Sequence, residues 1–167
     1  MQTTGGESGG RHLLDMQTVH LRAVGRHSKE GFYIETLREK ELYMNQKRIL
    51  VIDDETTFLL SMKRLLNGPE FFVATAENLE EAMTLLSEHD FHIVITDIRL
   101  TNVMKKEGLE ILQHIKRNKP CTTVVILTGY GNQEIMEKAY SLGANLYMEK
   151  PVPVNVLLRI IENQGCN

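Results

Sequence analysis

The sequence of 167 residues has no long apolar run. No apolar stretch approaches the roughly 20 residues that a membrane-spanning helix needs. The first twelve residues have no apolar core of the kind that a secretory signal contains. The sequence therefore predicts neither a membrane span nor a secretory signal, and the cytoplasm is the expected compartment.

Cysteine and clustered basic residues are also scarce. Cys121 and Cys166 are far apart and have no metal-ligand spacing, so we expect two free thiols in a reducing compartment. Lysine and arginine never form a run longer than two, and the formal net charge is -3. Direct binding to nucleic acid is therefore not expected. The six histidines show no paired metal spacing either.

Residues 1–46 differ in composition from the rest of the chain. Four of the first ten residues are glycine, and from Leu13 to Asn45 the apolar residues are scattered among polar ones. A helix from Ile34 to Met44 is compatible with the pattern. The segment has too little apolar surface for a core of its own, so we expect a disordered or partly helical extension before a domain at 47–167.

From Arg48 onward, short apolar strands alternate with amphipathic helices. Asn78 and Glu81 have the spacing of a helix N-cap, and Gly143 is placed to end a helix. The predicted strands are 48–53, 71–75, 92–96, 122–128 and 145–149, and apolar stripes between and after them predict five helices. Five strand–helix units predict an α/β fold, doubly wound and flavodoxin-like, with a parallel sheet in the order 2-1-3-4-5.

Polar side chains follow four of these strands. Asp53 and Asp54 follow the first and Asp97 follows the third, whereas Thr128 ends the fourth and Lys150 follows the fifth. Ligands of such sheets bind at the carboxyl ends of the strands, near the point where the strand order reverses. These side chains are therefore expected to meet at one edge.

Their chemistry indicates phosphoryl transfer. Two carboxylates about 4 Å apart repel each other by roughly 4 kcal/mol at an effective dielectric constant of about 20, so clustered acids favour a cation. Oxygen ligands at a wet edge favour Mg²⁺. An aspartate can itself attack phosphorus, and an ammonium and a hydroxyl can hold the phosphoryl oxygens.

Four segments resemble the motifs of a known family: "RILVIDDE", "VITDIRL", "VVILTGYG" and "GANLYMEKP". In order and spacing they are similar to the receiver domain of two-component response regulators, over about residues 47 to 163. The resemblance implies that Asp97 is the phosphoacceptor and that Mg²⁺ is held by Asp53, Asp54, Asp97 and the backbone carbonyl of Arg99. It also implies that Thr128 and Lys150 contact the phosphoryl group and that Tyr147 is the switch aromatic.

The resemblance further implies the partners. A sensor histidine kinase or a phosphotransfer protein would supply the phosphoryl group, and the chain would catalyse only its own phosphorylation and dephosphorylation. A downstream protein would bind the face of the fourth helix, fifth strand and fifth helix, and a second copy of the chain is another candidate partner. No output domain is expected within this chain. Candidate residues for this face are Tyr130, Tyr140, Tyr147 and Val152.

The loop after Asp97 departs from the family pattern. It contains no proline, and Gly108 lies eleven positions after Asp97, with Lys105 and Lys106 between them. Either the loop is a neutral length variant, or it changes the lifetime of the phosphoryl group or the choice of partner. By the same resemblance, Arg99 and Tyr130 occupy positions that influence loss of the phosphoryl group.

Two other functions use similar residues. An aspartate phosphatase of the haloacid dehalogenase kind needs a D-x-D motif after its first strand, whereas this chain has adjacent acids in "VIDDET". A pseudo-receiver would bind partners without being phosphorylated. The same residues could also have purely structural roles, in which Asp53 and Asp54 only cap a helix and Tyr147 is an ordinary core aromatic.

Overall fold

The computed structural model describes residues 46–100 and 107–163. The predicted helix from Ile34 to Met44, the two lysines of the long loop and Cys166 lie outside the described residues. The described elements are β1 (Lys47–Ile52), α2 (Thr56–Leu65), β2 (Phe71–Ala76), α3 (Leu79–Glu88), β3 (Ile93–Thr96), α4 (Glu107–Asn118), β4 (Thr123–Thr128), α5 (Gln133–Ser141), β5 (Leu146–Glu149) and α6 (Val154–Asn163).

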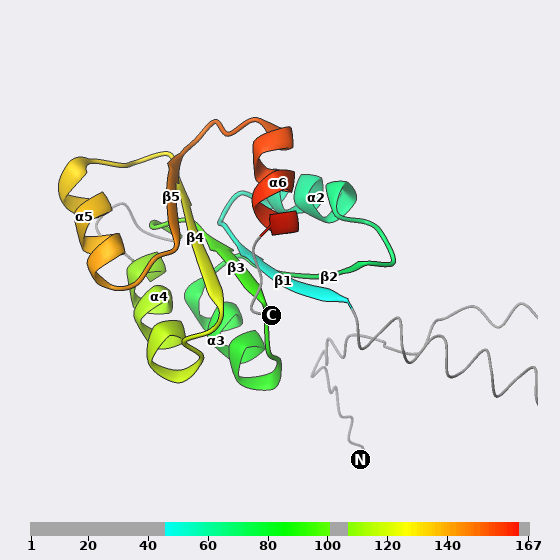
Figure 1. The fold of residues 1–167 in the computed structure, drawn as a ribbon, viewed down its shortest axis with the longest axis horizontal. Helices are drawn as coiled ribbons and strands as arrows, with labels where there is room; N and C mark the ends of the chain where they lie inside the picture. The colour runs from blue at the N-terminus through cyan, green and yellow to red at the C-terminus, as the bar shows by residue number, and fades with distance from the viewer. Residues whose placement is uncertain (1–45, 101–106, 164–167) are drawn as a thin grey trace, which may run out of the picture. The chain divides into compact units, whose positions relative to one another are not determined.

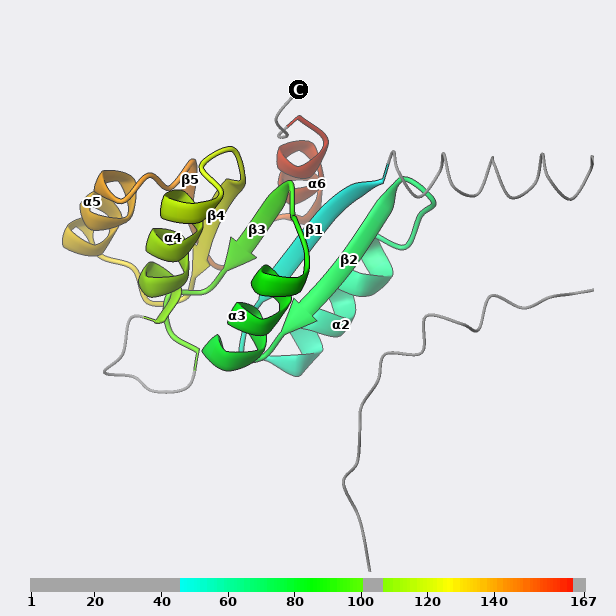
Figure 2. The ribbon, with the colours of Figure 1, turned by 90° about the horizontal axis from the view of Figure 1, so that it is seen from below.

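The strands form one parallel sheet in the order β2-β1-β3-β4-β5, which confirms the predicted topology. Ile52 pairs with Thr96 on one side and with Ala76 on the other. In Figure 2, β2 and β3 run in the same direction. Consecutive parallel strands need a crossover, and a helix lies between each pair of consecutive described strands and supplies it.

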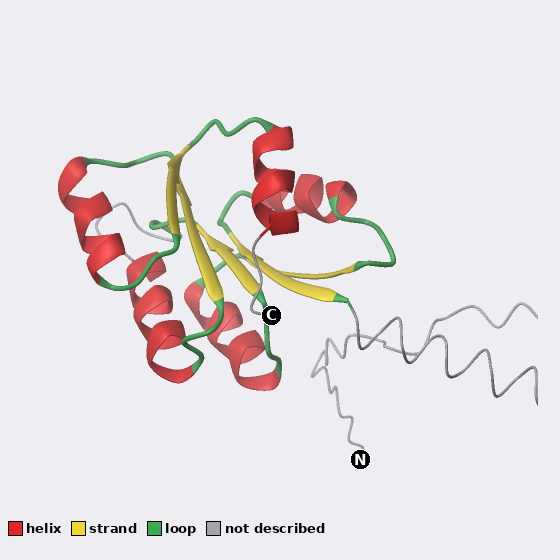
Figure 3. Cartoon of the chain, in the orientation of Figure 1, coloured by secondary structure: helices red, strands yellow, loops and turns green. Residues whose placement is uncertain are grey.

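Helices cover both faces of this sheet (Figure 1, Figure 3). On one face, α3, α4 and α5 pack on residues such as Leu50, Val94 and Ile126. On the other face, α2 and α6 pack on residues such as Val51 and Ile95. Because both faces are covered, the buried part of β1, Ile49–Ile52, is entirely apolar, and β3 is apolar except for its last residue, the buried Thr96.

The predicted helix ends are confirmed. Asn78 caps α3, since its Oδ1 accepts a hydrogen bond from the Glu81 amide at 2.9 Å. Gly143 follows α5 with φ 96°, a conformation that glycine adopts without strain, and its amide donates to the Tyr140 carbonyl at 2.9 Å. Among the described residues, no helix is both long and apolar enough to cross a membrane.

Candidate functional site

The ends of β1, β3, β4 and β5 bring polar residues to the carboxyl edge of the sheet. Asp53 and Asp97 directly follow β1 and β3, and Lys150 directly follows β5. The Asp97 amide donates to the Ile52 carbonyl at 3.0 Å, and the Lys150 amide donates to the Thr128 carbonyl at 2.8 Å. These backbone hydrogen bonds fix where the side chains start, so the sheet itself positions the site.

The Lys150 ammonium bridges two buried carboxylates. Its Nζ donates to Asp53 Oδ2 at 2.5 Å and to Asp97 Oδ2 at 3.1 Å. The side chains of Asp53 and Asp97 are 2% and 8% exposed, and that of Lys150 is 21% exposed. Since water reaches the carboxylates poorly, the ammonium is the charge that compensates them.

The remaining carboxylate oxygens bind backbone amides. Asp53 Oδ1 accepts from the Glu55 amide at 3.1 Å, and Asp97 Oδ1 accepts from the Arg99 amide at 3.3 Å. Each acid thus has one oxygen on the lysine and one on the loop that follows its own strand. This arrangement restricts the rotation of both carboxylates.

Burial and the ion pair have opposite effects on the pKa values of Asp53 and Lys150. Burial raises the pKa of Asp53 above its ordinary 3.8, although the hydrogen bond and charge of Lys150 work in the opposite direction. Burial by itself would lower the pKa of Lys150, but its hydrogen bond to Asp53 and the charges of Asp53 and Asp97 outweigh this and raise it above 10.5. Two carboxylates face one ammonium, so the cluster favours additional positive charge.

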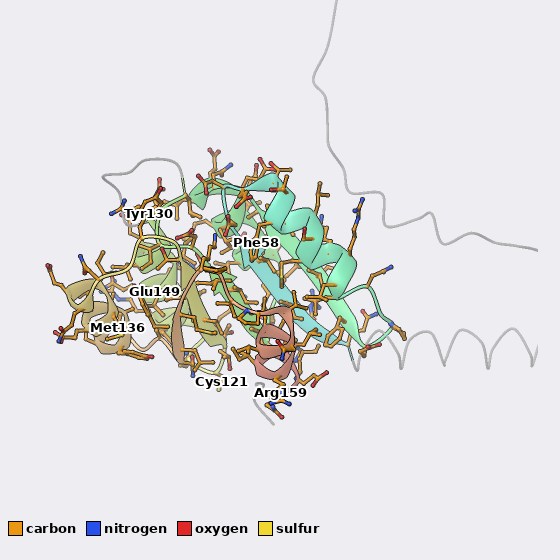
Figure 4. All side chains as sticks on the ribbon, turned by 90° about the horizontal axis from the view of Figure 1, so that it is seen from above. Phe58, Cys121, Tyr130, Met136, Glu149 and Arg159 are labelled. Atoms are coloured by element: carbon orange, nitrogen blue, oxygen red, sulfur yellow. The ribbon has the colours of Figure 1, made fainter. Side chains whose placement is uncertain are left out.

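Phe58, from α2, lies beneath the lysine. The Lys150 Nζ is 4.8 Å from the centroid of the Phe58 ring, a cation–π distance. Figure 4 labels Phe58 on the side-chain view of this region. The sequence predicted only a helix with an apolar stripe in this region, so the contact of this ring with the ammonium was missed. Phe58 lies four residues after Asp54, and this proximity to the acidic pair is the one feature of the sequence that could have indicated the contact.

Asp54 is not part of the bridged cluster, because its side chain is exposed. Across residues 46–100 and 107–163, no three His, Cys, Asp or Glu side chains are grouped closely enough to hold a metal. The donors nevertheless fit Mg²⁺, since Asp53 and Asp97 offer only oxygen at the edge of the sheet and carry excess negative charge. Asp54 is adjacent to Asp53 in the chain and is the nearest candidate in sequence for a further oxygen.

Gly108 preserves close packing behind Asp97 despite the longer loop. Its amide donates to the Ile98 carbonyl at 3.0 Å. A Cβ at this position would collide with the Asp97 carbonyl oxygen and would lie 2.8 Å from the Ile98 Cα. Only glycine allows the start of α4 to approach the backbone this closely.

Thr128 and the residues after it form the neighbouring part of the edge. The Thr128 side chain is fully buried, and its Oγ1 accepts from the Tyr130 amide at 3.2 Å. The Arg99 guanidinium lies 4.7 Å from the centroid of the Tyr130 ring. In Figure 4, Tyr130 and Cys121 lie at opposite ends of the sheet, so the exposed Cys121 is remote from this edge.

Tyr147, on β5, is half-buried and lies against α5 and the loop that follows β4. Its ring centroid lies 6.5 Å from that of Tyr140 on α5. Its Oη is buried, and a Cβ at Gly131 would collide with it and with the Glu149 carboxylate. Burial raises the pKa of Tyr147 and the Glu149 charge adds to this, whereas the Asn132 backbone amide acts in the opposite direction.

The family model for the response regulator receiver domain matches residues 49–162. The chain belongs to this family. The match contains β1 from its third residue, the other four strands in full, and every residue described at the edge of the sheet. The receiver domain is a signal-transduction module of two-component systems, and the predictions of family and fold are thereby confirmed.

Known proteins similar to this receiver domain include regulators and isolated domains. The acid tolerance regulatory protein ActR of Rhizobium meliloti is 29% identical over 76% of this chain, and the chain spans only 64% of that protein. The solution structure of the beryllofluoride-activated NtrC4 receiver domain dimer is 31% identical, with a TM-score of 0.63, over 70% of this chain and 94% of the other.

A third similar protein carries a modification. A response regulator of Burkholderia pseudomallei, whose crystal structure has a phosphorylated aspartic acid, calcium and citrate, is 29% identical with a TM-score of 0.64. The similarity covers 71% of this chain and 68% of that one. Receiver domains generally bind Mg²⁺ and interact with histidine kinases or phosphotransfer proteins, and some dimerise.

Proposed function

We propose that this receiver domain accepts a phosphoryl group on Asp97 from a histidine kinase or phosphotransfer protein and thereby changes the partners it binds. The observation that carries the proposal is the bridge from Lys150 to Asp53 at 2.5 Å and to Asp97 at 3.1 Å. This contact supports the proposal, because a buried carboxylate that could act as the nucleophile lies beside an ammonium that can hold a phosphoryl oxygen.

The chemistry needs only one bond exchange. A carboxylate oxygen of Asp97 attacks phosphorus, the new O–P bond forms, and the bond from phosphorus to the donor nitrogen or oxygen breaks with its electron pair. The Arg99 amide and the Lys150 ammonium orient the carboxylate beforehand through the hydrogen bonds at 3.3 Å and 3.1 Å. As negative charge accumulates, Lys150 exchanges its contact with Asp97 for one with the phosphoryl group.

Mg²⁺ supplies positive charge to the phosphoryl oxygens when it is bound. Asp53, Asp54, Asp97 and the Arg99 carbonyl would hold it. Support comes from the oxygen donors at the edge and from the excess of carboxylate over ammonium in the cluster. Asp54, which is exposed, would reach the cation from the solvent side.

Phosphorylation would alter the face formed by α5, β5 and α6. Thr128 would move toward the phosphoryl group, and Tyr147 would fill the space that Thr128 leaves. Tyr147 already has its Oη buried beside Gly131 and its ring next to Tyr140. Tyr130 and Tyr140 are exposed on this face and would contact the downstream partner or a second copy of the chain.

The proposal is tested by intact mass after incubation with Mg²⁺ and acetyl phosphate. We expect the wild type to gain one phosphoryl group, and neither Asp97→Asn nor the wild type in EDTA to gain it. Asp90→Asn is the matched control, since Asp90 lies just after α3 and its side chain is 90% exposed. A wild type that stays unmodified while its circular dichroism is that of a folded domain would support a pseudo-receiver instead.

A further inference from the structure

Glu107 is a buried carboxylate at the first position of α4. Its residue is only 5% exposed, which is uncommon for glutamate. Its Oε2 accepts a hydrogen bond from the Leu100 amide at 3.3 Å, and Leu100 is 1% exposed. The start of α4 therefore holds the backbone three residues after Asp97, in a place that water does not reach.

The Leu100 amide belongs to the same peptide group as the Arg99 carbonyl. A trans peptide group is planar, with its N–H and C=O pointing in opposite directions. When Glu107 holds the Leu100 N–H toward α4, the Arg99 oxygen must point away from α4. A carboxylate on the N–H also polarises the peptide group and increases the negative charge on the Arg99 oxygen.

Two other hydrogen bonds fix the same segment. The Arg99 amide donates to Asp97 Oδ1 at 3.3 Å, and the Gly108 amide donates to the Ile98 carbonyl at 3.0 Å. The peptide groups before and after the Arg99 Cα are therefore both anchored, one by Asp97 and the other by Glu107. Because both peptide groups are anchored, the Arg99 C=O bond is held in one orientation.

We propose that Glu107 is a positioning residue for the cation site, holding the Arg99 carbonyl in the direction from which it binds Mg²⁺. This role rests on the proposed function, because it requires that Mg²⁺ binds beside Asp53 and Asp97. Glu107 itself does not contact the cation. It acts on the ligand atom through one peptide group, as the hydrogen-bond partners of metal ligands commonly do.

The test measures Mg²⁺ affinity of the full chain by isothermal titration calorimetry. Glu107→Met removes the acceptor at similar size, and we expect its dissociation constant for Mg²⁺ to rise about 10-fold or more. Glu107→Gln keeps an oxygen that can accept from the Leu100 amide, and we expect an affinity close to that of the wild type. Glu110→Met, which removes an exposed carboxylate from the same helix, should leave the affinity unchanged.

A second readout distinguishes positioning from general damage. In the amide NMR spectrum, Mg²⁺ should shift the Leu100 resonance in the wild type and in Glu107→Gln. In Glu107→Met the shift should require higher Mg²⁺, while circular dichroism stays that of the wild type. Should Glu107→Met fail to fold, Glu107→Ala removes the same acceptor with a residue that favours helix.

The outcomes separate the two proposals. Wild-type affinity in Glu107→Met or Glu107→Ala, or equal losses in the methionine and glutamine variants, would overturn the role of Glu107 alone. A wild-type chain that binds no Mg²⁺ at millimolar concentration would overturn the proposed cation site and this role with it.

Discussion

The Lys150 ammonium makes it possible to bury two acids at the edge of the sheet. The side chains of Asp53 and Asp97 are almost fully buried, and one oxygen of each accepts a hydrogen bond from Lys150. Removing one member of a buried charged group leaves its partners uncompensated, which costs more than the group itself contributes. Lys150 therefore has both a structural and a proposed chemical role.

Lys150→Met should lower the free energy of unfolding by about 2 kcal/mol at neutral pH. The loss is less than that for a fully buried pair, because Lys150 is 21% exposed and the acids can take up a proton. Urea unfolding measures it, and Lys138→Met is the control, since Lys138 is exposed on α5. Equal stability of the wild type and Lys150→Met would show that the bridge does not stabilise the fold.

The same variant gives a prediction for alkaline pH. The folded-state pKa of Lys150 is raised above 10.5, so the folded protein holds this proton more tightly than the unfolded chain does. The contribution is complete below pH 10.5 and is lost as the pH rises through the folded-state pKa. The difference in unfolding free energy between wild type and Lys150→Met should therefore shrink above pH 10.5, and a growing difference would contradict the bridge.

At the scale of the elements, lysines satisfy carbonyls at helix ends. Lys119 Nζ donates to the Leu86 and His89 carbonyls at 2.8 Å and 2.7 Å, at the end of α3. Lys47 Nζ, from the first residue of β1, donates to the Ile161 carbonyl of α6 at 2.7 Å. The last carbonyls of a helix lack partners within it and carry partial negative charge, so an ammonium is favourable there.

Lys119→Met should lower the unfolding free energy by about 1 kcal/mol, because two carbonyls lose a charged donor at a partly exposed site. The pKa of Asp90, lowered by its hydrogen bond to Lys119, should return toward 3.8 in the same variant. Urea unfolding and an NMR titration of Asp90 measure the two effects. Arg117→Met, at an exposed position of α4, should change neither, and an unaltered Asp90 pKa in Lys119→Met would contradict the ion pair.

At the scale of the whole molecule, Tyr147 links the site to the proposed partner face. Its buried Oη lies against Gly131 in the loop after β4, and its ring neighbours Tyr140 on α5. A shift of the loop between β4 and α5 would therefore displace the Tyr147 side chain and, through it, α5. Close packing makes such a contact able to pass a displacement from one element to the next.

Gly131→Ala should push the Tyr147 ring toward solvent, because the new Cβ would collide with the Tyr147 Oη and the Glu149 carboxylate. We expect the nitration rate of Tyr147 by tetranitromethane, resolved by peptide mass spectrometry, to rise several-fold relative to Tyr140. Gly129→Ala is the control, since a Cβ there meets nothing within 4 Å. An unchanged ratio in Gly131→Ala would mean that the loop yields instead of the ring.

The sequence by itself determined the sheet order and the edge at which the polar residues meet. Apolar runs such as that of β3 have no polar face, so they predict a sheet covered on both sides, and right-handed crossovers then restrict the order. Asp53, Asp97 and Lys150 follow strand ends, and parallel strands deliver their carboxyl ends to one edge. These features depend on local patterns that are visible along the chain.

Only the tertiary structure decided which side chains touch. It placed Lys150 between two acids and above the Phe58 ring, left Asp54 exposed, and buried Glu107 at the start of α4. Adjacent residues such as Asp53 and Asp54 point in different directions, and the periodicity of a pattern does not say which one enters the cluster. Contacts between residues distant in the chain depend on how the loops and helices pack, and that packing is a property of the whole fold.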